Sequence, residues 1–274
     1  MTSFFLNRKP FVLTIIFLCW GIAFVPWEVQ AEMTGRQILE KVEQLHSVQD
    51  EETIVEMHLI NKRGNIKKSK VRNLFMKTGD KSVKTMTFFL EPRTVRGTGL
   101  LTWTHKDKED DQWLYFPSAE KERRISSVGK KNRFMGSDFT YEDNRPENLD
   151  THTYTVTGSE NVADHDCYII EALPATDQEK KESGYSKRKI WIRKDIFLPV
   201  KVEFYSKRGK LIKYMVGENP EKVTETAWRS TKVTMKNIKK KHETIMFLQI
   251  QGINRGLEES LFTLKNLKSM KQGE

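Results

Sequence analysis

The stretch KIWIRKDIFLPVKVEFYSKRGKLIKY, residues 189–214, decides the fold class of this chain. Ile190 and Ile192 alternate with charged or aromatic neighbours in its first part, and Val202 and Phe204 do the same in its second part. A period of two directs successive side chains to opposite faces of a β-strand. Strands of this kind have one face on an apolar interior and the other on solvent, as in many antiparallel sheets.

Two turns of the same form join strand-like segments. Residues 206–210 read SKRGK and residues 61–65 read NKRGN, each with a glycine free to take a positive φ in a hairpin turn. Further segments with a period of two fill much of residues 54–250. Most connections are of hairpin length and no ten-residue helical pattern separates the strands, which argues against parallel βαβ units. The sequence therefore predicts an antiparallel meander of roughly ten or eleven strands.

Helical patterns flank the strands at both ends. Thr34 and Gln37 have the spacing of a capping box, and apolar residues follow at helical spacing, which predicts an amphipathic helix over residues 35–47. Leucines between residues 257 and 267 indicate a short C-terminal helix. Because no Gly-, Ser- or Pro-rich linker divides the chain, we expect residues 32–274 to form a single domain.

The first 31 residues have the features of a cleavable secretory signal. Arg8 and Lys9 precede an uncharged apolar run over residues 11–25, and residues 29–31 (VQA) offer a small-x-small cleavage site. The alternative is a membrane anchor, but about 20 apolar residues are needed to span a bilayer and this run is shorter. We therefore expect residues 1–31 to be removed and the mature chain to lie outside the cytoplasm.

Composition excludes several classes of protein. Charged residues make up 31% of the chain, too many for a multi-span membrane protein, and its aromatic and β-branched content is too high for a disordered tail. With 47 Lys and Arg against 37 Asp and Glu, the formal net charge is +10. Basic clusters at residues 62–70, 121–131 and 236–241 are either solvated hairpin tips or a surface that attracts anionic lipid head groups or an acidic partner. Nucleic acid is not an expected partner.

No catalytic signature occurs in the sequence. It has no G-x-S-x-G, H-E-x-x-H, P-loop, G-x-G-x-x-G or Cys-x-x-Cys motif. Asp138, Glu142 and Asp143 could gather a cation, but their spacing lacks the glycine and the final acid of a calcium loop. We therefore predict no catalytic residue, no metal site and no cofactor, and expect that the protein is not an enzyme.

The segment WLYFPSAEKERRISSVGKKNRFMGSDFTYED, residues 113–143, resembles the outer-membrane lipoprotein-sorting proteins, relatives of the periplasmic lipoprotein carrier LolA. FFLEPRTVRGTGLLTW (residues 88–103), the stretch 189–214 and LEESLFTL (residues 257–264) resemble the same family. The resemblance implies a mainly β fold, an unclosed antiparallel β-barrel (LolA/LolB-like) with an N-terminal helix and a short C-terminal helix covering its mouth. It also implies a periplasmic location in a diderm bacterium. Some members look like companions of inner-membrane lipid exporters of the RND type, which makes such an exporter an expected partner.

The function we expect is a non-enzymatic carrier or chaperone that shields the acyl chains of lipoproteins or lipids during transport to the outer membrane. The alternative is a lipid- or lipoprotein-sensing module that uses the same barrel to signal to an envelope partner. The aromatic and aliphatic residues of the strands form either a packed core or an acyl-chain cavity. The residues we expect to line the cavity are Phe88, Leu101, Trp103, Trp113, Phe134, Phe139, Ile190 and Phe204. Arg93 and Arg96, just before a strand, are expected at the cavity mouth.

Overall fold

A computed structural model describes residues 1–2, 32–79, 82–105, 110–125, 127–145 and 147–269. The predicted signal segment lies outside the described residues, apart from its first two. Residues 33–274 make up one compact unit. Among the described helices, none combines the length and the apolar character that crossing a bilayer requires.

One sheet of thirteen strands makes up most of the described chain. The strands are β1 (Asp50–Ile60), β2 (Ile66–Gly79), β3 (Ser82–Glu91), β4 (Gly99–Thr104), β5 (Asp111–Phe116), β6 (Lys121–Arg124), β7 (His152–Val162), β8 (His165–Pro174), β9 (Tyr185–Arg193), β10 (Pro199–Ser206), β11 (Leu211–Lys222), β12 (Trp228–Asn237) and β13 (His242–Ile253). The helices are α1 (Gly35–His46), α2 (Asp177–Glu182) and α3 (Leu264–Ser269). The 3₁₀ turns are η1 (Pro117–Ala119), η2 (Ser127–Lys131), η3 (Phe134–Gly136), η4 (Leu149–Thr151) and η5 (Glu259–Leu261).

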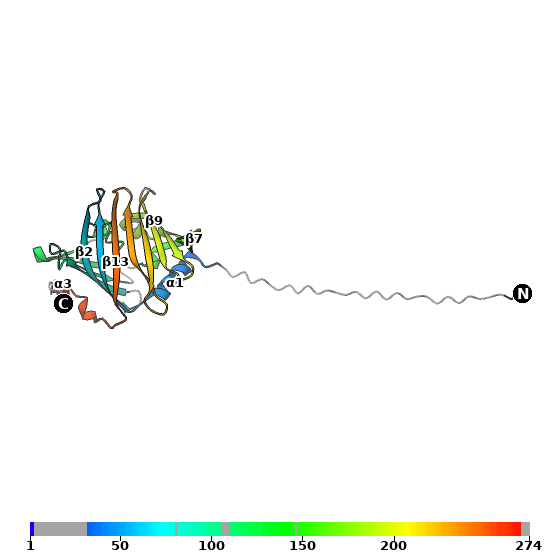
Figure 1. The fold of residues 1–274 in the computed structure, drawn as a ribbon, viewed down its shortest axis with the longest axis horizontal. Helices are drawn as coiled ribbons and strands as arrows, with labels where there is room; N and C mark the ends of the chain where they lie inside the picture. Colours follow the sequence, from blue (N-terminus) through cyan, green and yellow to red (C-terminus); the bar gives the residue numbers. More distant parts are fainter. Residues whose placement is uncertain (3–31, 80–81, 106–109, 126, 146, 270–274) are drawn as a thin grey trace. The chain divides into compact units, whose positions relative to one another are not determined.

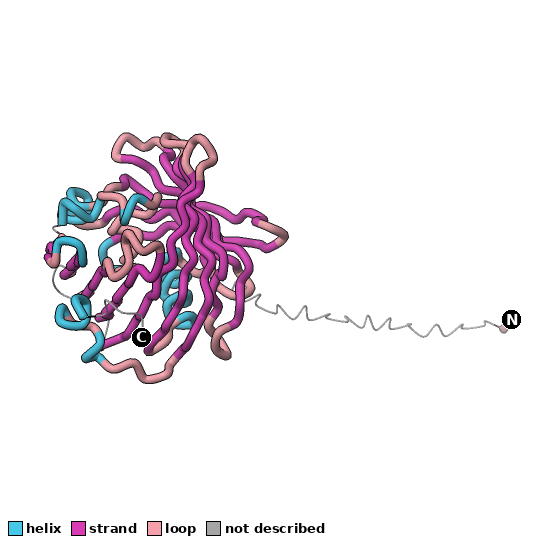
Figure 2. Tube along the Cα trace, turned by 60° about the vertical axis from the view of Figure 1, so that its left-hand side comes forward, coloured by secondary structure: helices cyan, strands magenta, loops and turns pink. Residues whose placement is uncertain are grey.

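The first and last strands pair in the middle of the sheet. The strand order is β6-β5-β4-β3-β2-β1-β13-β12-β11-β10-β9-β8-β7, and Figure 1 shows blue β1 beside orange β13. Val55 pairs with Leu248 and Met57 pairs with Met246 across this central junction. The two edge strands, β6 and β7, do not pair with each other in the described sheet. The predicted unclosed antiparallel barrel is therefore confirmed, and the tube in Figure 2 shows how strongly the sheet twists and curls.

The strand count exceeds the ten or eleven that the sequence predicts. The pattern does not reveal β6, because its four residues, KERR, are all charged and exposed and so show no alternation. The chain also departs from a simple meander. It builds one half of the sheet outward from β1 to β6, crosses to the other edge, and builds the second half inward from β7 to β13. We call the described residues of this connection, 127–145 and 147–151, the crossover segment.

The crossover segment packs on one face of the sheet, which we call the inner face. Phe139 lies in a core cluster with Ile190 and Phe204, on strands of the second half. Phe134 lies in a cluster with Leu100, on a strand of the first half. Apolar side chains of this one segment therefore join the cores of both halves of the sheet.

The C-terminal helix α3 packs on the other face of the first half. Leu101 follows Leu100 in β4 and so points to the opposite face, where it clusters with Phe262 and Leu267. An added Cβ at Gly99 would lie 2.6 Å from a methyl carbon of Leu267. A larger residue at this position would therefore require the Leu267 side chain to shift, which shows how closely α3 approaches β4.

The N-terminal helix α1 begins with the predicted capping box. The Gln37 amide donates to Thr34 Oγ1 at 3.2 Å, and the Thr34 amide donates to Gln37 Oε1 at 2.8 Å. An added Cβ at Gly35 would lie 2.7 Å from the Tyr154 carbonyl in β7, so the start of α1 lies directly against that strand. Ile38 and Leu39 then bury against the inner face, in the same cluster as the crossover segment.

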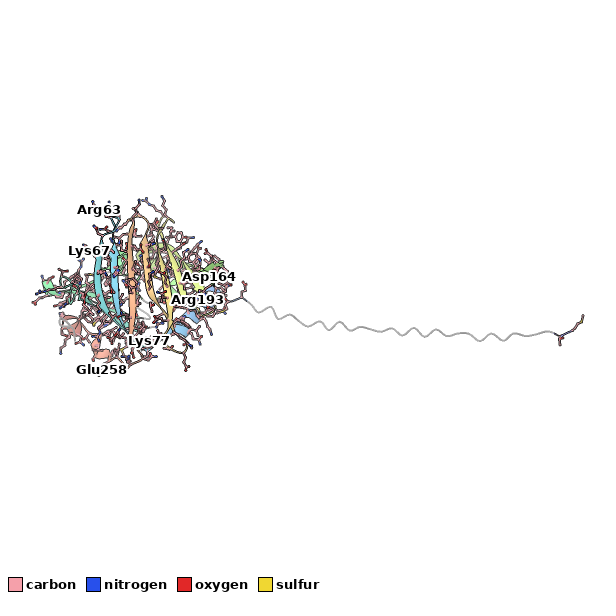
Figure 3. The ribbon with its side chains drawn as sticks, viewed as in Figure 1. Arg63, Lys67, Lys77, Asp164, Arg193 and Glu258 are labelled. Carbon is pink, nitrogen blue, oxygen red and sulfur yellow. The ribbon has the colours of Figure 1, made fainter. Side chains whose placement is uncertain are left out.

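The two ends of the sheet differ in character. Because neighbouring strands are antiparallel, the β1–β2, β10–β11 and β12–β13 turns all lie at one end, which we call the hairpin end. Figure 3 labels Arg63 and Lys67 at this end and Lys77 and Glu258 at the opposite end. The chain passes from α1 into β1 at the end opposite the hairpin end.

Phe262 is fully buried between α3 and the sheet, so Phe262→Ala should cost about 3–5 kcal/mol of unfolding free energy through lost burial and a residual cavity. Urea unfolding followed by circular dichroism measures this loss. The matched control is Phe247→Ala, since Phe247 on β13 is 38% exposed and should change stability by less than about 1 kcal/mol. Equal losses for the two variants would contradict the burial of Phe262 in this cluster.

Candidate functional site

Two neighbouring cavities lie beside α1 on the inner face. The larger has a volume of about 440 Å³ and the smaller about 300 Å³. Leu39, Val42 and Glu147 border both, so the cavities share a wall. The other apolar residues that line the larger cavity are Val48, Phe75, Val83, Leu149 and Leu248. Those that line the smaller one are Phe139, Ile190, Pro199, Val202, Phe204, Met215 and Met235.

A third space continues the row of cavities along the first half of the sheet. It has a volume of about 190 Å³, shares Asn73 and Phe75 with the larger cavity, and is bordered by Phe134. Asn73 Oδ1 is buried there and has no hydrogen-bond partner among the described residues. The interior between the sheet, α1 and the crossover segment is thus incompletely filled, unlike an ordinary close-packed core.

Polar residues gather where the larger cavity meets the end of α1. Arg229 Nη2 lies 2.9 Å from Glu51 Oε2 and donates to the His46 carbonyl at 3.1 Å. Lys77 Nζ donates to Ser47 Oγ at 2.7 Å. These contacts give an otherwise apolar cavity a charged rim, which can contact a polar head group while the interior takes hydrocarbon.

His46, the last residue of α1, joins the helix to two parts of the sheet. Its Nδ1 accepts from the Trp228 amide at 3.0 Å, so Nε2 carries the proton and donates toward the Ile196 and Phe197 carbonyls at 3.1 and 3.2 Å. Burial lowers the pKa of His46 below its usual 6.5, and the nearby Arg229 charge lowers it further. The neutral ring therefore fixes the C-terminal end of α1, the helix that forms one wall of the cavity.

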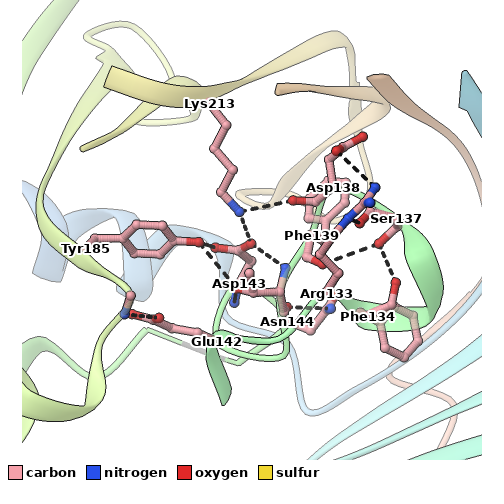
Figure 4. Close-up of polar contacts among 12 residues, drawn as sticks. Arg133, Phe134, Ser137, Asp138, Phe139, Glu142, Asp143, Asn144, Tyr185 and Lys213 are labelled. Atoms are coloured by element: carbon pink, nitrogen blue, oxygen red, sulfur yellow. Dashed lines mark hydrogen bonds and ion pairs between the residues drawn. The ribbon is translucent and has the colours of Figure 1, made fainter. Parts of the chain in front are cut away.

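A buried ion pair fixes the crossover segment to the second half of the sheet, as Figure 4 shows. Lys213 of β11 pairs with Asp143, and each side chain is only 4% exposed. Lys213 Nζ also donates to the Asp138 carbonyl at 3.1 Å, and Tyr185 Oη donates to Asp143 Oδ1 at 2.8 Å. Burial, together with the Asp143 charge, raises the pKa of Tyr185 well above 10, so its hydroxyl remains a donor. The ring centroid of Phe204 lies 4.8 Å from Lys213 Nζ, and Phe204 also borders the smaller cavity.

A second ion pair borders the smaller cavity. Arg188 donates two hydrogen bonds to Glu147, at 2.7 and 2.8 Å, and Tyr154 Oη donates a third at 2.7 Å. Partial desolvation by the surrounding side chains would raise the pKa of Glu147, whose side chain is still 34% exposed. The charge and hydrogen bonds of Arg188, with the Tyr154 hydrogen bond, outweigh this effect and lower the pKa to about 2. This carboxylate is therefore charged and fully paired, which suits a structural role better than proton transfer.

The three acids of residues 136–143 point to different partners. Asp138 contacts His242 at 2.5 Å, and Glu142 accepts from Ser183 Oγ at 2.5 Å. Asp143 pairs with Lys213. Within the described part of the chain, no three His, Cys, Asp or Glu side chains are grouped as a metal site requires.

Comparison with known proteins places this architecture in a family. A family model described as an uncharacterized protein matches residues 81–269. The solved structure of a protein domain assigned to outer membrane lipoprotein sorting, from Vibrio parahaemolyticus, is 30% identical with a TM-score of 0.79. The similarity covers 85% of this chain and 98% of that one. The chain belongs to the LolA-like family of outer-membrane lipoprotein-sorting proteins.

Further solved structures share the LolA-like fold. A DUF1329 family protein from Desulfovibrio piger is 27% identical with a TM-score of 0.80, over 85% of this chain and 97% of that one. A LolA superfamily protein from Nitrosomonas europaea is 21% identical with a TM-score of 0.66, over 85% and 99%. No curated protein matches the sequence significantly.

The cavity residues expected from the sequence fall into two groups in this LolA-like fold. Phe139, Ile190 and Phe204 border the smaller cavity, and Phe134 borders the third one. The other four, Phe88, Leu101, Trp103 and Trp113, lie together in the cluster around α3, on the other face of the sheet. Trp103 Nε1 donates to the Phe262 carbonyl at 3.0 Å in that cluster.

The two arginines expected at the cavity mouth lie in the turn between β3 and β4, at the hairpin end. Both are exposed, and Arg96 Nε donates to the Leu90 carbonyl at 3.0 Å. Lys77 and Val83, which border the larger cavity, lie at the opposite end of β2 and β3. Charged residues that do lie at that cavity's rim, such as Arg229, were not identified from the sequence.

Removing Lys213 should leave the buried Asp143 carboxylate without its cation. We expect Lys213→Met to cost about 3–5 kcal/mol of unfolding free energy, measured by urea denaturation. Lys232→Met is the matched control, because Lys232 pairs at 2.9 Å with Glu218 while their side chains are 31% and 42% exposed. The unfolding free energy of Lys232→Met should fall by less than about 1 kcal/mol. Comparable losses in the two variants would contradict an anchoring role for Lys213.

The lowered pKa of His46 predicts a loss of stability on acidification. Below about pH 6.5 the unfolded chain binds a proton at His46 that the folded chain resists, so the unfolding free energy falls as pH drops toward the lower folded pKa. His46→Asn should flatten this dependence between about pH 7.5 and about pH 5.5 in urea denaturation. The exposed His165→Asn serves as control and should keep the wild-type slope. An unchanged slope in His46→Asn would contradict the assignment.

Proposed function

We propose that this protein is a non-enzymatic carrier that shields the acyl chains of a lipoprotein or lipid on the way to the outer membrane. The row of linked apolar cavities beside α1 supports the proposal most strongly. The two larger volumes, about 440 and 300 Å³, fall within or near the range of ordinary small-molecule pockets. The shared border at Leu39 and Val42 suits an extended hydrocarbon chain that passes along the helix.

The physical chemistry of transport needs a cavity rather than a reacting group. Moving a methylene from water to an apolar site gains about 0.8 kcal/mol, so an acyl chain supplies the driving force itself. Asn73 Oδ1, the buried unpaired acceptor between two of the cavities, would accept a hydrogen bond from an amide or hydroxyl of the cargo. That hydrogen bond would remove the free-energy cost of leaving the buried Asn73 oxygen without a partner.

The proposal includes a periplasmic location and a transport partner. Residues 1–31 have the form of a secretory signal, and the 30%-identical Vibrio domain is assigned to outer membrane lipoprotein sorting. An inner-membrane exporter of the RND type is the proposed source of the cargo, on the family resemblance of the sequence. Affinity purification from a diderm host after membrane crosslinking would identify such an exporter.

A charge placed in the shared cavity wall tests the carrier directly. Val42→Glu should weaken binding of a fluorescent fatty acid by more than about tenfold, because a carboxylate would have to stay desolvated beside the bound chain. The matched control is Gln44→Glu, which adds the same charge to an exposed position of the same helix. Equal affinity in the two variants, with native circular dichroism for both, would contradict binding in these cavities.

A further inference from the structure

Three basic hairpin tips lie together at the hairpin end. They are residues 61–68, which include the β1–β2 turn and the start of β2, residues 206–211 around the β10–β11 turn, and residues 236–241, which include the end of β12 and the β12–β13 turn. The strand order β2-β1-β13-β12-β11-β10 places them along one end of adjacent strands, at the top of Figure 1. We refer to these three segments as the hairpin tips.

The hairpin tips carry a strong positive charge with little compensation. They contain four, three and four Lys or Arg residues respectively, and no Asp or Glu. The contacts of the tips with acids of the described strands are long: Lys68 to Glu56 at 3.5 Å and Lys236 to Glu243 at 3.8 Å. Among the described acids, none forms an ion pair with Arg63, Arg208 or Lys240. These cations are therefore available to an external anion.

Each hairpin tip also exposes one large aliphatic side chain. Ile66 is 54% exposed, Leu211 is 36% exposed and Ile238 is 46% exposed. These three are half of the six most exposed large hydrophobic residues in the described chain. Exposed apolar residues scattered singly need no explanation, but here one recurs on each basic tip at the same end of the sheet.

We propose that the hairpin tips dock the protein on an anionic phospholipid bilayer. Interfacial binding needs cations at the level of the lipid phosphates and apolar side chains that enter the boundary with the acyl chains. Cations alone would suit any polyanion, and the aliphatic residue on each tip favours the bilayer over an acidic protein. A groove of about 400 Å³ between the first and third tips provides room for a lipid head group. Three lysines (Lys62, Lys236 and Lys241) and Ile238 line it, together with one acid, Glu243.

Docking through the hairpin tips also sets the orientation of the cargo site. Phe75, Lys77 and Val83 place the larger cavity toward the opposite end of β2 and β3. On the bilayer, this end would point away from the membrane surface. The docking surface is therefore separate from the cavity of the proposed carrier and extends its function with a membrane-facing side.

Vesicle sedimentation with the full chain and with two matched pairs of variants tests the proposal. Lys239→Gln/Lys240→Gln should weaken binding to phosphatidylglycerol–phosphatidylethanolamine vesicles by roughly thirty-fold at low salt, an effect that shrinks as salt screens the charges. Ile66→Ser/Ile238→Ser should weaken binding by roughly tenfold, and this effect should persist in high salt. The charge control is Lys222→Gln/Arg255→Gln, two exposed cations at the opposite end, which should change binding by less than about threefold.

Two further measurements separate docking from cargo capture. All tip variants should bind a fluorescent fatty acid with wild-type affinity, since none of their residues borders the cavities beside α1. Equal binding of the wild type to phosphatidylcholine vesicles, or tighter binding to poly-glutamate than to anionic vesicles, would overturn the proposal. So would unchanged vesicle binding by both tip variants.

Discussion

Pairing of the first strand with the last is the constraint on which the rest of this fold depends. With β1 and β13 joined at the centre, the two halves of the sheet grow outward and end at the unpaired edges β6 and β7. The chain must therefore pass once from one edge of the sheet to the other. The crossover segment, residues 127–145 and 147–151, makes this connection over the inner face. Between the curled sheet, the crossover segment and α1, cavities of about 440 and 300 Å³ remain that side chains do not fill.

The contacts that hold the crossover segment explain where the row of cavities lies. Phe134 anchors it to the first half through apolar packing, whereas Asp143 anchors it to the second half through Lys213. A buried ion pair adds little net stability over an apolar pair, but it demands one geometry and so holds the segment at a defined distance from the sheet. The row of cavities remains between this segment, the strands and α1. An interior of this kind gives up packing energy that a bound hydrocarbon chain can restore.

Local sequence patterns predicted the architecture better than they predicted the candidate site. Alternation in β9 and β10 and the capping box at Thr34 predicted the strands and the first helix, because both depend on neighbouring residues. The crossover segment has no period, and its ion pair joins residues 70 positions apart, so no local signal reveals it. Alternation also leaves open which face is internal: Leu100 points toward the crossover segment and Leu101 toward α3. The stripe of Leu39 and Val42 on α1 was the available signal for the cavity wall.

The central claim is that the interior holds an acyl chain. Native mass spectrometry of the mature protein purified from the periplasm of a diderm host, followed by lipid extraction of the bound fraction, tests it most directly. The account predicts a population that carries one acyl lipid or lipoprotein per chain and releases it on denaturation. A protein that appears only at its unliganded mass, and that takes up no fluorescent fatty acid when one is added, would contradict the account and indicate that the protein acts through its surface.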